Sequence, residues 1–98
     1  MDLNKFGKRA FLSAQKRGKI SECGRKEMHQ QSVDSLSSEI LEVEKASEME
    51  FSEHLPQYTE IVEELADVAI VAITELYRRG IDIEKILHEK MKFNETRS

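Results

Sequence analysis

The sequence predicts an all-α domain built as a four-helix bundle, with residues 1–98 forming one domain. Apolar residues recur at the three- and four-residue spacing of amphipathic helices in four separate stretches. Of the 98 residues, 35% are charged, one is proline and four are glycine. This composition favours long charged helices over a turn-rich β architecture. A chain of this length holds only a small core, so association of several copies is also expected.

Residues 1–27 are expected to form a basic helix followed by a connector. The helix covers residues 2–17, and its apolar face consists of Leu3, Phe6, Ala10, Phe11 and Ala14. Gly18 is predicted to end it, and residues 19–27 form the connector. Because the apolar face is weak and rich in alanine, packing on the rest of the domain is favoured over binding to a membrane surface.

The second helix is expected from about His29 to Met49. Its single apolar stripe consists of Val33, Leu36, Ile40 and Val43. Glu39 and Glu42 lie on the flank of this stripe, three residues apart. Both carboxylates therefore project from the same side of the helix.

The third helix is expected from about Pro56, which suits a first helical turn, to Arg79, which precedes Gly80. Its main stripe consists of Tyr58, Ile61, Leu65, Val68, Ala72 and Leu76. A second side is also apolar, through Ala66, Ala69, Ile70, Val71 and Ile73. A helix that is apolar nearly all round is buried nearly all round. The central helices are therefore predicted to form the interface of a homo-oligomer, either a dimer or a tetramer.

The fourth helix is expected from Ile83 to about Arg97, with Asp82 as its N-terminal cap. Its inward-pointing residues are predicted to be Ile83, Ile86 and Leu87. The same line continues through Lys90 and Asn94 and passes close to Arg97. Such polar groups are suited to binding anionic oxygens, as in a phosphate chain. The alternative is a frayed helix end whose positively charged side chains interact favourably with the helix dipole.

Charge is distributed unevenly along the chain. Its net charge is −4, and residues 28–77 carry twelve acidic residues against one basic residue. Such a block repels phosphates, so no nucleic-acid polymer is expected as a partner. No apolar run approaches the roughly 20 residues of a membrane span. The single cysteine, Cys23, favours a reducing compartment. The chain is therefore expected to be a soluble cytoplasmic protein that does not enter membranes.

Asp67 interrupts the longest apolar segment of the chain, residues 65–73. A buried ionised carboxylate requires a cation or strong hydrogen-bond donors. Glu64 and Glu60 lie three and seven residues earlier and so project from the same side. A divalent cation would turn the repulsion among these carboxylates into attraction. The sequence therefore predicts that Asp67 has a partner, either a cation or a set of strong hydrogen-bond donors.

A metal site shared by the second and third helices follows if these helices pack antiparallel. Glu39 and Glu42 would then face Glu64 and Asp67. Ligands that are all oxygen favour Mg²⁺ or Mn²⁺ over zinc. A solvated acidic bundle is the alternative, because glutamate is a common residue on exposed helix faces. The three histidines match no metal motif, and they are expected to be ordinary surface or core residues: His29, His54 and His88.

The order of these motifs resembles the MazG-like members of the all-α nucleoside triphosphate pyrophosphohydrolase superfamily. Their signature of ExxE, a spacer and ExxD is similar to Glu39-Ile40-Leu41-Glu42 and Glu64-Leu65-Ala66-Asp67. The segment from Lys90 to Arg97 is similar to their KxxxNxxR helix. The resemblance covers roughly residues 28–97, while residues 1–27 match nothing distinctive.

The resemblance implies hydrolysis of a nucleoside triphosphate to the monophosphate and pyrophosphate, with the base of the substrate left open. It implies that Mg²⁺ is bound by Glu39, Glu42, Glu64 and Asp67. It further implies that the triphosphate is approached by Lys90 and Asn94, with Arg97 beside them. Glu39 is our choice for the base that activates water. Two alternatives are a non-catalytic helical interaction or regulatory module and a phosphoribosyl-ATP pyrophosphatase.

Overall fold

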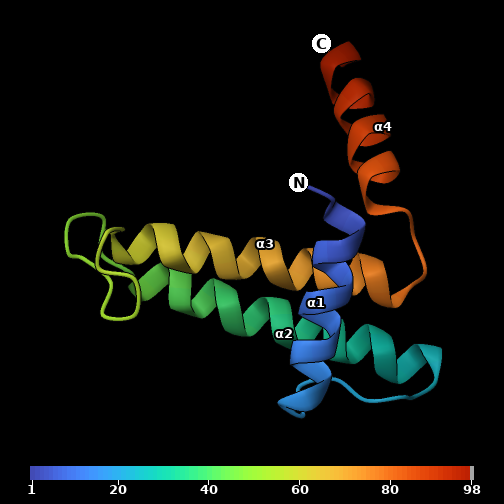
Figure 1. Ribbon diagram of the computed structural model, residues 1–98, viewed down its shortest axis with the longest axis horizontal. Coiled ribbons are helices and arrows are strands. Elements are labelled where there is room, and N and C mark those ends of the chain that lie inside the picture. Colours follow the sequence, from blue (N-terminus) through green and yellow to red (C-terminus); the bar gives the residue numbers. More distant parts are fainter. Residues whose placement is uncertain (98) are drawn as a thin grey trace.

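A computed structural model of the chain, which describes residues 1–97, is all-helical and confirms the all-α part of the predicted fold class (Figure 1). Its elements are α1 (Leu3–Lys16), α2 (Arg25–Lys45), α3 (Glu60–Arg78) and α4 (Ile83–Thr96). Helices α2 and α3 lie side by side and antiparallel, while α1 crosses α3 and α4 projects from the far end of α3 (Figure 1). Ser98, the last residue of the predicted domain, lies outside the described residues.

The ends of α1 are fixed by local hydrogen bonds. The Asp2 side chain accepts from the backbone N–H groups of Asn4 and Lys5. At the other end Gly18 has a φ of 72°, a left-handed conformation that glycine adopts without steric cost. The Lys19 N–H then donates to the Ala14 carbonyl at 2.9 Å, as in a Schellman motif. The predicted stop at Gly18 is therefore confirmed.

Helix α2 begins and ends four residues earlier than predicted, and α3 begins at Glu60 rather than at Pro56. The connection over residues 46–59 is a folded loop instead of a short turn. The Ser47 and Ser52 hydroxyls each accept two backbone N–H groups within it, and Phe51 pairs with Thr59 in an isolated bridge. These local bonds satisfy the backbone without a helix, so the helix that Pro56 was expected to begin starts only at Glu60.

The start of α4 is held by α1. Asp82 caps α4, as predicted, by accepting from the Lys85 N–H. The Asn4 side chain donates to the Asp82 carboxylate at 3.0 Å and accepts from the Ile83 N–H at 2.8 Å. The Leu3 N–H donates to Glu84 Oε1 at 2.9 Å. Hydrogen bonds therefore join the first turns of α1 and α4, which lie near opposite ends of the sequence.

The apolar core is small and lies where α1, α3 and α4 meet. Ile83 is fully buried, and Ile20 of the connector is also buried. A Cβ at Gly7 would lie 2.5 Å from Ile83 Cδ1 and 3.3 Å from Tyr77 Cβ. Glycine at this position therefore lets α1 approach α3 and α4 closely.

We expect Ile83→Ala to destabilise the protein by about 2–5 kcal/mol, because it removes a fully buried side chain and leaves a cavity. Ile81→Ala deletes the same atoms from a side chain that is 42% exposed and serves as the matched control. Urea denaturation followed by circular dichroism measures both. If both variants lower the free energy of unfolding equally, α4 does not pack on α1 as described here.

Much of the apolar surface remains exposed in a single chain. The exposed large apolar side chains of α2, α3 and α4 include Val33, Ile40, Leu41, Val62, Leu65, Ile70, Ile86, Leu87, Met91 and Phe93. The expectation that Ile86 and Leu87 point inward is therefore wrong within one copy. Ile86 is 38% exposed and Leu87 is 43% exposed. Among residues 1–97, none of the helices combines the length and apolar character of a membrane span.

Candidate functional site

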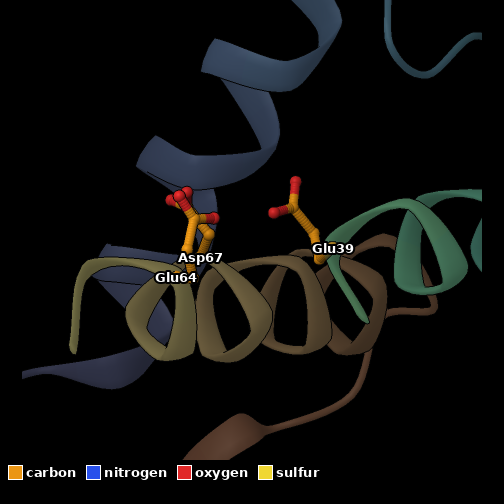
Figure 2. Close-up of side chains that lie close together, drawn as sticks. All are labelled: Glu39, Glu64 and Asp67. Carbon is orange, nitrogen blue, oxygen red and sulfur yellow. The ribbon is translucent and has the colours of Figure 1, made fainter. Parts of the chain in front are cut away.

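Three carboxylates from α2 and α3 converge on one point. Glu39, Glu64 and Asp67 each offer a carboxylate oxygen, and these oxygens all lie within 4.8 Å of one another. Figure 2 shows Glu64 and Asp67 together on α3, with Glu39 reaching toward them from α2. The spacing of three residues places the α3 pair on one side of the helix. Antiparallel packing of α2 and α3 brings Glu39 to the same point.

The electrostatics of this carboxylate cluster (Glu39, Glu64 and Asp67) disfavour three negative charges. Burial raises the pKa of all three groups. The negative charge of Asp67 further raises the pKa of Glu39 and of Glu64, and Glu63 further raises that of Asp67. Partial burial and mutual repulsion therefore leave the cluster in need of positive charge.

The donor set fits a hard divalent cation. All three groups offer oxygen, which Mg²⁺ and Mn²⁺ prefer. At a Mg²⁺–oxygen distance of about 2.1 Å, ligands on opposite sides of the ion are about 4.2 Å apart. The cluster's limit of 4.8 Å is slightly larger. Adjacent ligands of an octahedral ion lie about 3.0 Å apart, so the three side chains would have to move closer together to bind one ion.

Glu42 and Glu60 lie outside the close group of three. Glu42 and Glu64 line a neighbouring cavity of about 250 Å³, and the charge of Glu42 also raises the pKa of Glu39 and of Glu64. Glu60 instead accepts the Ser47 N–H at 2.9 Å and so fixes the start of the loop. Of the four predicted metal ligands, the structure thus brings three together and leaves Glu42 nearby.

A larger cavity of about 320 Å³ adjoins the cluster, between α1, α2 and α3. Glu39 and Asp67 form part of its wall, Glu75 lines it further along α3, and Arg17 and Lys19 line it from the end of α1. The remaining lining residues are Ala10, Ser13, Ala14, Ile20, Asp34, Ser35, Ser38, Ile70, Val71 and Thr74. The cavity thus combines apolar walls with charged groups of both signs.

Arg17 and Lys19 are site residues that the sequence reasoning missed. The positive charges of both groups lower the pKa of Glu39 and of Asp67, opposing the effect of burial. In the sequence they appear only as two of the eight basic residues in residues 1–27. Gly18 predicted the end of the helix, but the position of its two neighbours beside Glu39 and Asp67 depends on how α1 crosses α3.

His54 also lies closer to the site than the sequence suggested. Its Nδ1 is 3.0 Å from Glu63 Oε2, and the Ser52 hydroxyl donates to the other oxygen of the same carboxylate. The hydrogen bond to Glu63 and its charge raise the pKa of His54. Hydrogen bonds from Ser52 and His54 lower the pKa of Glu63. The hydrogen bonds from Ser52 and His54 to Glu63 hold the loop beside Glu64 onto α3.

Lys90 and Asn94 on α4 and Arg97 directly after it are exposed and do not line either cavity. Lys90 Nζ lies 4.7 Å from the centre of the Phe93 ring, and the Arg97 guanidinium lies 5.6 Å from it. Helix α4 leaves α3 at the end opposite the loop that precedes Glu64 (Figure 1). Within one copy, the structure therefore does not bring these three residues to the carboxylate cluster.

Comparisons of the chain with known protein families, with curated proteins and with solved structures found no match. The resemblance described above thus depends on the motifs alone.

Proposed function

We propose that the protein is a Mg²⁺-dependent nucleoside triphosphate pyrophosphohydrolase that forms nucleoside monophosphate and pyrophosphate. The observation that carries the proposal is the meeting of Glu39, Glu64 and Asp67 beside a cavity whose wall includes Glu39 and Asp67. The motif order supports the same activity. A cavity of about 320 Å³ falls in the range of small-molecule sites, and its partly apolar walls suit a nucleoside.

Each part of the site has a role in this reaction. Bound Mg²⁺ would neutralise phosphate charge and favour attack by water at phosphorus. Glu64 and Asp67, together on α3, are the principal ligands, and Glu42 can support them from the neighbouring cavity. Glu39, which faces them from α2, is suited to accept the proton of the attacking water. Burial raises the pKa of Glu39, which increases its affinity for that proton.

We further propose that the active form is a homo-oligomer, a dimer or a tetramer. The chain exposes 7591 Å², whereas a compact monomer of 11.3 kDa exposes about 5,700 Å². Its radius of gyration is 14.9 Å, against about 12.6 Å for a compact domain of this length. An excess of about 1,900 Å² per copy suits an obligate interface. Val62, Leu65, Ala66, Ala69 and Ile70 form an exposed stripe on α3 at helical spacing, which would supply its centre.

In such an oligomer, Lys90 and Asn94 act on the substrate held by another copy. The extended α4 cannot bring them to the carboxylates of its own chain, but its exposed Ile86, Leu87 and Met91 can pack on a neighbour. Lys90 would then reach the phosphate chain as a cation and Asn94 as a hydrogen-bond donor, with Arg97 beside them. A nucleotide substrate and the lone Cys23 favour a cytoplasmic location.

A panel of canonical and damaged nucleoside triphosphates, incubated with the protein and Mg²⁺, tests the activity. We expect at least one member to yield pyrophosphate, and we expect a chelator to stop the reaction. Including phosphoribosyl-ATP separates the general activity from that of a phosphoribosyl-ATP pyrophosphatase. If no nucleotide releases pyrophosphate, the proposed activity is wrong and the non-catalytic helical module replaces it.

A further inference from the structure

The turn that ends α1 fixes Arg17 and Lys19 in space. Arg17 is the C-terminal cap of α1, and its N–H donates to the Ser13 carbonyl at 3.0 Å. Gly18 follows in the left-handed conformation, and the Lys19 N–H closes the turn on Ala14. The next residue, Ile20, is only 6% exposed. The backbone on both sides of the turn is thus anchored, although the two charged side chains are exposed.

Both positively charged side chains are exposed to solvent, and both also line the cavity. Arg17 and Lys19 line it together with Glu39 and Asp67. Among the residues that line this cavity they are the only cations, and none of the salt bridges within residues 1–97 involves either. Their charges thus remain available to a ligand. Neighbouring Lys16, by contrast, does not line the cavity.

The charge of the ligand decides which role these cations have. A metal ion alone is repelled by Arg17 and Lys19, because all carry positive charge. A phosphate chain is attracted by them and by the metal together. Two cations at the wall would therefore weaken a site for a metal alone, whereas a site for a metal with polyphosphate gains from both.

We propose that Arg17 and Lys19 bind the phosphate chain of the substrate in the same copy that supplies Glu39, Glu64 and Asp67. This inference rests on the proposed function and deepens it, because it assigns a binding role to residues 1–27, which carry no part of the motif signature. It also sets the orientation of the substrate. The phosphates lie between the carboxylate cluster and the end of α1, and the nucleoside extends along the cavity toward Val71 and Thr74.

Isothermal titration calorimetry with Mg²⁺ and inorganic tripolyphosphate tests this assignment without requiring turnover. The variants are Arg17→Gln, Lys19→Gln and the double substitution, with Lys16→Gln as the matched control. We expect each single substitution to weaken binding of tripolyphosphate about tenfold to a hundredfold, since each removes a charge-assisted contact. We expect the control to bind as the parent does. Titration with Mg²⁺ alone should show the opposite change, with tighter binding by the double variant.

The outcomes separate this inference from the proposed activity. If the parent binds tripolyphosphate but hydrolyses no nucleotide, and the double variant binds it weakly, the inference holds while the activity fails. If the parent hydrolyses a nucleotide and the double variant binds tripolyphosphate as tightly as the parent, the inference is wrong while the activity stands. Failure of the parent to bind tripolyphosphate at all also overturns the inference. Circular dichroism of each variant verifies that the fold is retained.

Discussion

Asp67→Asn should abolish Mg²⁺-dependent pyrophosphate release and at the same time raise the melting temperature in metal-free buffer. Loss of a charged ligand leaves Glu64, with support from Glu42, to hold the ion with a weaker field. Activity should therefore fall by orders of magnitude. Without metal, the same change removes a charge that burial and the neighbouring Glu63 both disfavour. Asparagine carries no such penalty.

The direction of the stability change depends on pH in a defined way. The pKa of Asp67 is raised in the folded state, so protonation of Asp67 favours the folded chain. This contribution to the free energy of unfolding is fully present below the unfolded pKa and is lost as pH rises through the folded pKa. The advantage of asparagine should thus appear at neutral pH and vanish in acid. Added Mg²⁺ should stabilise the parent more than the variant.

Four melting curves, parent and variant with and without Mg²⁺, measure these effects beside an assay of pyrophosphate release. Glu44→Gln on the exposed side of α2 is the control for removing one negative charge. A variant that melts at a lower temperature without metal, yet responds normally to Mg²⁺, would identify Asp67 as a structural hydrogen-bonding residue. The proposed site would then be wrong.

Two inactive variants should restore activity to each other when they are co-expressed. Asp67→Asn removes a ligand, and the double substitution Lys90→Ala with Asn94→Ala removes the groups that α4 supplies to another copy. In a mixed dimer, one site carries both defects and the other carries none. With random pairing, co-expression should recover about one quarter of the parental activity. Each inactive protein alone should remain near background.

The control for this experiment disrupts the interface directly. Leu65 is 53% exposed at the centre of the α3 stripe, and Leu65→Glu would place a charge there at little cost to an isolated chain. Introduced into both partners, it should convert the oligomer to monomers in light scattering and eliminate the recovery. Recovery that persists in demonstrated monomers would refute the shared site, as would an absence of recovery in demonstrated mixed dimers.

The helices and most of the carboxylate cluster could be predicted because the signals are local. Gly18, Gly80 and Asp82 determine helix ends through backbone conformation and capping. Asp67 stood out as a charge in an apolar segment, and helical spacing placed Glu64 beside it. Only the antiparallel packing of α2 and α3 had to be assumed to add Glu39.

The remaining features depend on contacts that no local pattern contains. The loop over residues 46–59 is held by serine hydroxyls and by a bridge, so Pro56 does not mark the start of α3, which begins at Glu60. The periodicity of α4 shows which face is apolar, but it does not show what covers that face. Arg17 and Lys19 became part of the site only because α1 crosses α3.

Phosphorus NMR of a nucleotide turned over in the presence of Mg²⁺ tests the central claim most directly. The technique distinguishes cleavage between the α and β phosphates from cleavage between the β and γ phosphates. We predict equal amounts of nucleoside monophosphate and pyrophosphate from the parent, and neither product from Asp67→Asn or in the presence of a chelator. Formation of nucleoside diphosphate and inorganic phosphate, or product formation that continues without a divalent cation, would contradict the account.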